Sequence, residues 1–429
     1  LPDIIETAAE SRSRYYLVWE VYTMKQKFID GAQKRLQGMA AWPGAEVASF
    51  ALVTELIPEL CRVPYDYLLR DDPEGMAECT LLVQEYLDVD MILANLDVYN
   101  FEAEAMGAEV KFYPDHCADI VRSNYFIKGP QDLDKIKFKG LDTGRFPYLL
   151  RYCRAYEKYT GAETFPMFSA PWTMAGNLYG IDRLVMDTME EPDFVTEFLN
   201  KIVDDFHAPM FRALAAELPG FHTMSLADAF ASVPVVTPAI VREFIKPSLE
   251  RELEKLDMPG IVLQDTAFFG TAQLSGAARK EYEDFIVWSN NMFFCIDPDL
   301  TELTPEYARE VANAHGVPLM AGIAAKQVEF GEIPETVSII KDFVLKGKKG
   351  PTPLIFFFNN LSPRTSTDKL LAATRAVRVF GRPEADENTA YEIPENISFE
   401  KFLEDKMKNN PEGYTFHWLE KSGYAGLRK

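Results

Sequence analysis

Two stretches of sequence decide the predicted fold, AEAMGAEVKF at 103–112 and ADAFASVPVVTPAIVREFIKPSLE at 227–250. Each leads from the end of an expected strand into the helix that follows. In the second stretch, Thr237 is a typical helix cap and Pro238 suits the first helical position. From about 160 to 380, short apolar runs alternate with longer amphipathic segments. This alternation predicts βα units around a parallel sheet.

Seven apolar segments are expected to be strands, and the amphipathic segments near them to be helices. The expected strands are 88–98, 165–170, 222–227, 260–265, 292–296, 317–322 and 353–358. The expected helices are 45–60, 192–216, 237–257, 304–314, 333–346 and 366–380. With an eighth strand within 136–150 or 284–289, the sheet would close into a (β/α)₈ TIM barrel. An open doubly wound sheet is the alternative, but no GxGxxG turn follows an early strand.

The alternation does not extend over the whole chain. Residues 45–382 are the expected barrel domain, whereas 1–44 and 383–429 are expected to be an N-terminal and a C-terminal extension. The extensions would cover the barrel ends or build a homodimer contact.

Composition excludes some classes of partner. The 429 residues carry a formal net charge of -22, which disfavours binding to nucleic acid or to an anionic membrane. No long uncharged apolar run and no signal-peptide pattern is present, so a cytoplasmic protein is expected. The five cysteines are scattered and form no CxxC pair, which predicts reduced thiols.

The two stretches quoted first resemble the uroporphyrinogen decarboxylase superfamily, which includes decarboxylases and cobalamin-dependent methyltransferases. The resemblance covers about 45–382 and includes four further segments: GPQDLDKIK at 129–137, SAPWTMAGNLYG at 169–180, GIAAKQVEFGEIPETV at 322–337 and FFFNNLSPRTSTDKL at 356–370. Because these segments occur in the family's order, the resemblance implies the family's barrel fold.

Two further segments bear on the branch of the family. RLQGMAAWPG at 35–44 has one arginine where true decarboxylases carry an arginine-rich motif for substrate carboxylates, so porphyrinogen decarboxylation is disfavoured. EAEAMG at 102–107 is similar to the methyltransferase branch, and the chain resembles the methyltransferase components of O-demethylases. Thiol methyltransferases of that branch bind zinc at positions that correspond here to Gln264, Thr266 and Asn359 or Asn360. These are poor zinc ligands, so a thiol acceptor is not expected.

The resemblance therefore implies transfer of a methyl group from a small donor, expected to be an aromatic methyl ether, to the Co(I) of a separate corrinoid protein. The chain has no DxHxxG motif, so the cobalamin would arrive on that partner. An oxygen-sensitive Co(I) implies anaerobic metabolism. A uroporphyrinogen-like decarboxylase and a non-catalytic tetrapyrrole- or corrinoid-binding protein are the alternatives.

The departing phenolate would need a proton, and a carboxyl group in a dry pocket can supply one. Asp265 at the end of GIVLQD is the first candidate, and Asp228 in SLADAF is the second. For each, the alternative is a structural role as a cap of the loop or turn that follows.

Substrate contacts are expected from other residues at strand ends. These are Tyr99, Asn100, Glu102, Trp172, Gln264, Thr266, Asn359 and Asn360. Strand alternation allows either Asp265 or its two neighbours to face inward. Glu102 is otherwise a helix N-terminal acid, and the asparagines are otherwise turn residues. No metal site is expected, although Asp265, Cys295 and Asp297 offer an altered one and zinc is left open.

Overall fold

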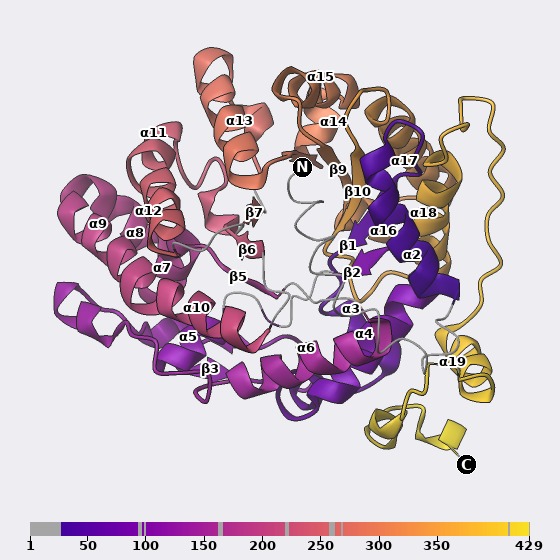
Figure 1. The fold of residues 1–429 in the computed structure, drawn as a ribbon, viewed down its shortest axis with the longest axis horizontal. Coiled ribbons are helices and arrows are strands. Elements are labelled where there is room, and N and C mark those ends of the chain that lie inside the picture. The colour runs from indigo at the N-terminus through magenta and orange to yellow at the C-terminus, as the bar shows by residue number, and fades with distance from the viewer. Residues whose placement is uncertain are drawn as a thin grey trace.

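The computed structural model describes residues 27–92, 97, 100–161, 166–218, 223–256, 262–266, 269–410 and 412–428. Eight parallel strands form two sheets with the orders β2-β1-β10-β9-β8 and β5-β6-β7. The strands are β1 (Ala48–Ala51), β2 (Met91–Ile92), β5 (Met167–Ser169), β6 (Thr223–Ala227), β7 (Val262–Thr266), β8 (Phe293–Ile296), β9 (Leu319–Ala324) and β10 (Leu354–Asn359). Figure 1 shows β5, β6 and β7 on one side of the centre and β1, β2, β9 and β10 on the other.

The strand order is that of a (β/α)₈ barrel, because strands that follow one another along the chain are neighbours. The first strand also pairs with the last, with Ala48 beside Ile355 and Ala51 beside Phe358. The described residues form no pairing between β2 and β5 or between β7 and β8. The predicted α/β barrel class is confirmed.

The eighth strand differs from the prediction. It is β1, which lies inside the segment 45–60 that was predicted to be a helix, and the helix α3 (Leu56–Cys61) follows it. The segments 136–150 and 284–289 lie instead in loops and helices, among them α6 (Phe146–Thr160) and α13 (Gly276–Asn290). All four residues of β1 are buried. A short strand buried on both faces shows no alternation, so periodicity alone does not separate it from a buried helix.

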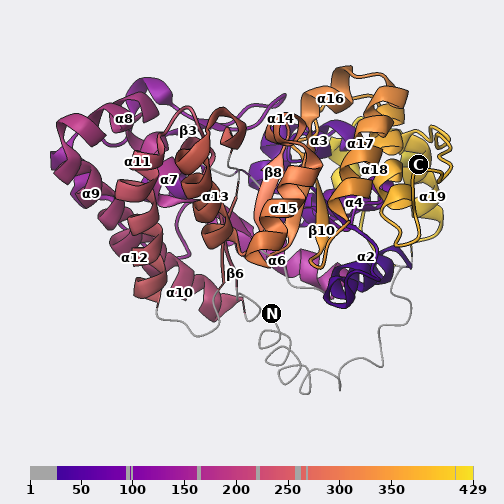
Figure 2. The same ribbon diagram turned by 90° about the horizontal axis from the view of Figure 1, so that it is seen from above.

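Helices surround the strands. Besides α3, the helices that precede β7 in the chain include α2 (Lys27–Gly38), α4 (Pro73–Leu87), α5 (Phe101–Met106), α7 (Pro171–Tyr179), α8 (Ile181–Glu190), α9 (Pro192–Lys201), η6 (Ile202–His207), α10 (Ala208–Glu217), α11 (Pro238–Ile240), η8 (Val241–Ile245) and α12 (Lys246–Leu256). The later ones are α14 (Asp299–Leu303), α15 (Pro305–His315), α16 (Ala325–Phe330), α17 (Ile333–Gly347), α18 (Thr367–Phe380) and α19 (Phe399–Lys408). In Figure 2, α3, α14 and α16, which follow β1, β8 and β9 along the chain, lie with α8 along one edge of the molecule, and α2, α6 and α10 lie along the opposite edge.

The predicted helix starts at Thr237 and Thr304 are confirmed. Thr237 Oγ1 accepts a hydrogen bond from the amide of Ile240 at 3.3 Å, and Thr304 Oγ1 accepts one from Tyr307 at 3.3 Å. Each threonine precedes a proline at the first helical position. A backbone N–H at this position has no acceptor within the helix, so proline, which lacks that N–H, is tolerated there. Among the described residues, no helix is both long and apolar enough to cross a membrane.

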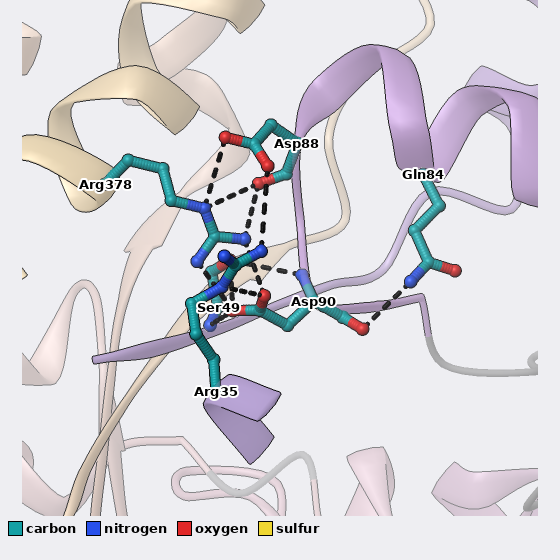
Figure 3. Close-up of polar contacts among 6 residues, drawn as sticks. All are labelled: Arg35, Ser49, Gln84, Asp88, Asp90 and Arg378. Atoms are coloured by element: carbon teal, nitrogen blue, oxygen red, sulfur yellow. Dashed lines mark hydrogen bonds and ion pairs between the residues drawn. The ribbon is translucent and has the colours of Figure 1, made fainter. Parts of the chain in front are cut away.

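A buried ion-pair network joins the start of two strands to the flanking helices (Figure 3). Asp90, which is 3% exposed, precedes β2, and its carboxylate accepts from Arg378 of α18 twice at 2.7 Å and from Arg35 of α2 at 2.6 Å. The backbone N–H of Ser49 in β1 donates to the same carboxylate at 2.8 Å, and Gln84 of α4 donates to the Asp90 carbonyl at 2.9 Å. The network lies at the amino ends of β1 and β2, where barrels place stability rather than catalysis.

The segment after α19 is attached to the barrel by a second buried carboxylate. Glu78 of α4 is fully buried and accepts from the amide of Thr415 at 2.7 Å, from the Thr415 hydroxyl at 2.8 Å and from the amide of Phe416 at 3.0 Å. The hydroxyl of Tyr159 on α6 donates to it at 2.6 Å. The C-terminal part of the chain thus packs on α4 and α6.

Candidate active site

The carboxyl ends of the parallel strands meet at one end of the barrel, where barrel enzymes place catalysis. The predicted site residues with described side chains that follow or end these strands are Asn100, Glu102, Trp172, Asp228, Asn359 and Asn360. They come from the segments after β2, β5, β6 and β10. The topology therefore places the predicted residues at one end of the barrel.

Four other predicted residues are described only in part or not at all. Tyr99 lies outside the described residues. Gln264, Asp265 and Thr266 are described as backbone, which forms β7 and pairs in parallel register with residues 225–227 of β6. This pairing places them at the carboxyl end of the same sheet as Asp228. Their catalytic and binding roles stay predictions.

Asp228 is fully buried directly after β6. Its Oδ1 accepts from the amide of Thr173 at 3.0 Å and from the Thr173 hydroxyl at 2.5 Å, so it fixes the first turn of α7. The cap predicted for the turn after Asp228 itself is not formed by its side chain. Within the described part of the chain, Asp228 Oδ2 has no hydrogen-bond partner. Burial raises the pKa of Asp228 to about 7, although the hydrogen bonds from Thr173 lower it.

Glu102 on α5 is the second buried carboxyl group near these strand ends. It is 1% exposed, and its Oε1 accepts from the amide of Ser169, the last residue of β5, at 2.5 Å. Its Oε2 has no hydrogen-bond partner among the residues that the structure describes. Burial raises the pKa of this carboxyl group, and the hydrogen bond from Ser169 opposes the rise. Glu102 does lie in the first turn of α5, as the alternative of a helix N-terminal acid predicted, and it is buried there.

The side-chain amide of Asn100 forms hydrogen bonds with other residues of the protein. Its Nδ2 donates to Asp97 Oδ1 at 2.7 Å and to the Ala118 carbonyl at 2.9 Å, and its Oδ1 accepts from the amide of Ile120 at 3.0 Å. Asn100 thus orders the segment that follows β2. Direct contact of Asn100 with substrate stays a prediction.

Asp97 and Arg145 form a buried pair that was not predicted from the sequence. Arg145 donates from Nη2 to Asp97 Oδ2 at 2.5 Å and from Nε to Glu104 Oε2 at 2.5 Å. Its guanidinium carbon lies 4.8 Å from the ring centroid of Phe112, within cation–π distance. Burial raises the pKa of Asp97 to about 6, against the charge of Arg145. Asp97 is thus another carboxyl group near these strand ends that can hold a proton close to neutral pH.

Sequence reasoning missed these two residues for different reasons. Asp97 falls inside the predicted strand 88–98, where a polar residue near the end was the only signal. Arg145 lies 48 residues away from Asp97 in the chain, directly before α6, and nothing local marks it. The pair exists only because the fold brings the segment after β2 against the start of α6.

Trp172 and the two asparagines differ in exposure. Trp172 is fully buried on α7, and its indole N–H donates to the Phe230 carbonyl at 3.2 Å. Asn359 is half-buried at the end of β10, and Asn360 is exposed with φ of 50°, a left-handed conformation that asparagine tolerates. The two asparagines therefore have the more accessible side chains, and binding of substrate by all three residues stays a prediction.

The described residues do not fit a zinc ion. No group of three or more His, Cys, Asp or Glu residues in the described part of the chain is arranged to hold a metal. Cys295 is 2% exposed, and burial raises the pKa of its thiol, which disfavours the thiolate that zinc requires. Asp297 accepts from the Thr301 hydroxyl at 2.5 Å and, at 3.4 Å, from the amide of Ala324. Because the side chain of Asp265 is not described, its part in an altered metal site stays a prediction.

Comparison with known proteins agrees with this fold. Residues 68–265 match the family model of uroporphyrinogen decarboxylase (URO-D). The methyltransferase from Methanosarcina mazei is a similar solved structure, with a TM-score of 0.61 and 15% sequence identity over 81% of this chain and 98% of that one. Part of the chain is thus similar to the uroporphyrinogen decarboxylase family, and its fold is similar to that of this methyltransferase.

A curated relative indicates the branch. Methylated-thiol–coenzyme M methyltransferase from Methanosarcina mazei is 26% identical over 196 residues, which are 44% of this chain and 51% of that protein. The chain therefore spans about half the length of the curated relative that it matches. The predicted resemblance to the methyltransferase branch of the uroporphyrinogen decarboxylase superfamily is confirmed.

Proposed function

We propose that this protein is a methyltransferase that moves a methyl group from a small methylated donor to the Co(I) of a separate corrinoid protein. The relation to a named methyltransferase supports the reaction class. The corrinoid partner follows from the branch of the superfamily that the sequence resembles. The donor proposed is an aromatic methyl ether.

One observation carries the choice of an ether donor over a thiol donor. Asp228 combines full burial, a position directly after β6 and a pKa raised to about 7 by that burial, so it holds a proton near neutral pH. In the proposed reaction, the methyl group would pass to the cobalt of the partner protein, and the carbon–oxygen bond would break with its electron pair on oxygen. The leaving oxygen then takes a proton and departs as the phenol. Asp265 at the end of β7 is proposed as the group nearest the substrate, with Asp228 behind it.

The residues present do not support the zinc-thiolate chemistry of the thiol methyltransferases. Gln264, Thr266 and Asn359 or Asn360 stand where the resemblance expects the ligands, and neither amides nor a hydroxyl group are good zinc ligands. A thiolate acceptor would therefore lack the group that activates it. The proposed acceptor is the cobalt of the partner protein.

Decarboxylation of a porphyrinogen is not proposed. A substrate with several carboxylates needs several free guanidinium groups, and the buried Arg145 is already paired with Asp97 and Glu104. Its charge is thus neutralised before substrate arrives.

The test is a methyl-transfer assay with a reduced corrinoid protein as acceptor. The purified protein is mixed under anaerobic conditions with this acceptor and, separately, with methoxyarenes, methylamines, methylthiols or a porphyrinogen. Methyl–cobalt absorbance and released CO₂ are followed. We expect methyl–cobalt formation with a methoxyarene only. Release of CO₂ from the porphyrinogen, or methylation of coenzyme M or homocysteine by this protein alone, would refute the proposal.

A further inference from the structure

The loop that follows β7 is attached by hydrogen bonds to the segment that follows β6. The amide of Phe269 donates to the Ser232 hydroxyl at 3.1 Å, and the Phe269 carbonyl accepts from the amide of Val233 at 2.9 Å. The hydroxyl of Tyr282 on α13 donates to the same carbonyl at 3.4 Å. Both backbone polar groups of Phe269 are therefore bonded, which fixes the position from which its side chain projects.

Gly270 permits this close approach of the two segments. Its φ is 92°, in the left-handed region that favours glycine. A Cβ atom at Gly270 would lie 2.2 Å from the carbonyl oxygen of Val233, so no other residue fits without a shift of the backbone. The loop after β7 thus contacts the segment after β6 backbone to backbone.

A buried carboxylate attaches the same loop to the other half of the barrel. Asp299, the first residue of α14, is 3% exposed. Its Oδ2 accepts from the amides of Gly270 at 2.7 Å and Thr271 at 3.1 Å, and its Oδ1 accepts from that of Ala272 at 3.0 Å. Among the described residues β7 and β8 form no strand pairing, so Asp299 links the segments that follow these two strands. In Figure 2, α14 lies along the edge that α3 and α16 share.

The ring of Phe269 is half-buried and lies at the end of a row of three phenylalanines. Its centroid lies 6.5 Å from that of Phe294 in β8, with an interplanar angle of 83°. The centroid of Phe294 lies 6.0 Å from that of Phe357 in β10. We call Phe269, Phe294 and Phe357 the aromatic row. Its first contact is edge-to-face, a geometry that aromatic rings prefer.

Strand register shows that Phe294 and Phe357 point into the barrel. A Cβ atom at Gly347, the last residue of α17, would lie 3.2 Å from Leu354 and 3.7 Å from Leu319, so both leucines face the surrounding helices. Phe357 comes three residues after Leu354 in β10, and Phe294 pairs with the residue that follows Leu319 in β9. Because side chains alternate along a strand, both phenylalanines have the opposite, inward orientation.

We propose that Phe269 is a specificity-determining residue of the donor site, against which the aromatic ring of the methyl donor packs. This inference rests on the proposed function and deepens it. Phe294 and Phe357 are 2% and 5% exposed, whereas Phe269 is half-buried, so Phe269 is the member of the row that can accept a further ring. It also comes four residues after Asp265, the group proposed to lie nearest the substrate.

The chemistry of the row selects an aromatic donor. A ring placed against Phe269 adds one more contact between aromatic rings, which an aliphatic donor of the same size cannot make. Because the backbone of Phe269 is fixed by its hydrogen bonds, little freedom is lost when the ring binds. Asp299 is a positioning residue in this arrangement, since it acts through the loop that carries Phe269.

The first test measures binding to the free protein, without a corrinoid partner. The probes are methoxybenzene and methoxycyclohexane, which share the methyl ether and differ in the aromatic ring, and saturation-transfer NMR gives the Kd of each. Phe269→Leu should weaken methoxybenzene binding about three- to tenfold and leave methoxycyclohexane unchanged. Phe269→Tyr keeps a ring and should bind methoxybenzene as the unsubstituted protein does. An unsubstituted protein without preference for methoxybenzene, or equal weakening of both probes in Phe269→Leu, would overturn the proposal.

Phe402 on α19 provides the matched control for loss of a half-buried ring. Its centroid lies 5.4 Å from that of Tyr86, outside the aromatic row. Phe402→Leu should leave the affinities for both probes unchanged. If Phe402→Leu weakens methoxybenzene binding as much as Phe269→Leu does, the effect belongs to stability and the proposal fails.

The second test examines Asp299 as the positioning residue. Asp299→Ala removes both acceptor oxygens, so the amides of 270–272 should exchange hydrogen faster and the preference for methoxybenzene should fall. Asp299→Asn keeps one acceptor oxygen and should give an intermediate result, which decides the matter if the alanine variant does not fold. Glu302→Ala, at an exposed site on α14, is the control and should change neither readout. Faster exchange with an unchanged preference would refute the positioning role.

The third test is methyl transfer from a methoxyarene to the corrinoid protein. Phe269→Leu should raise KM about three- to tenfold with little change in kcat, because the lost contact binds substrate and transition state equally. If methoxybenzene binds through Phe269 but no methyl group is transferred, the proposed function fails and the ring site stands. If methyl transfer occurs and Phe269→Leu leaves KM unchanged, the ring site fails and the proposed function stands.

Discussion

Arg378 and Asp90 form a bidentate ion pair, in which Nη1 and Nη2 of Arg378 each lie 2.7 Å from a different carboxylate oxygen of Asp90. The pair joins the last barrel helix, α18, to the start of β2. Both residues are buried, at 9% and 3% exposed. Because β1 pairs with both β2 and β10, this contact helps to hold the place where the barrel closes.

Removing one partner should therefore be costly. Arg378→Met is expected to lower the free energy of unfolding by about 3–5 kcal/mol, because it leaves the buried charge of Asp90 without its main partner. Urea unfolding followed by circular dichroism measures the loss. Arg151→Met is the control, since its pair with Glu74 is exposed and should change stability by less than about 1 kcal/mol. Similar losses in the two variants would contradict the prediction.

Glu78 should control the C-terminal segment. Glu78→Gln replaces one carboxylate oxygen by an NH₂ group, which cannot accept the hydrogen bond from the backbone N–H of Phe416. The segment around Thr415 and Phe416 should therefore detach from α4 more often. We expect a loss of about 1–3 kcal/mol and faster proteolysis near this segment, located by mass spectrometry. Glu74→Gln, on the same helix but exposed, is the control. Equal cleavage rates in both variants would show that Glu78 does not hold the segment.

Stability should depend on pH through Asp228 and Asp97. Their folded pKa values, about 7 and about 6, lie above the usual 3.8 of an aspartate. A group with a raised folded pKa stabilises the fold most below its unfolded pKa, and this contribution is lost as pH rises through the folded value. The contribution of both groups should thus decline between about pH 4 and pH 7.

The substitution Asp228→Asn measures how much Asp228 contributes to this loss of stability with rising pH. Relative to the unsubstituted protein, the variant should gain on the order of 1–4 kcal/mol in unfolding free energy between pH 5 and pH 8. Denaturant unfolding at the two pH values measures this difference. A difference that stays constant with pH would show that Asp228 is ionised throughout.

Asn360 tests a backbone role against a binding role. Its φ of 50° disfavours alanine, so Asn360→Ala should cost about 1–2 kcal/mol, whereas Asn360→Gly should be close to neutral. Thermal unfolding measures both. Asn291, at the end of α13 with φ of 53°, gives the matched control for the backbone effect. If Asn360→Gly also keeps full methyl transfer, Asn360 does not bind the substrate.

Several elements were predictable from local sequence. The apolar runs around Phe294, Met320 and Phe357 indicated strands, and β8, β9 and β10 are found there within two residues of the predicted bounds. Thr237 and Thr304 marked helix starts because a cap hydroxyl followed by proline is a local signal. The helix predicted over 45–60 was wrong, since four buried residues of β1 carry no periodicity.

By itself, the sequence determined the alternation of strands and helices, and with it the barrel class and the end at which Asp228 and Asn359 lie. These follow from patterns of a few neighbouring residues. Only the tertiary structure decided that Arg145 meets Asp97, that Asp228 binds the first turn of α7, and that Asp299 binds the loop after β7. These groups are far apart in the chain. The raised pKa values of Asp97 and Asp228 come from burial among distant elements, which no local pattern of residues contains.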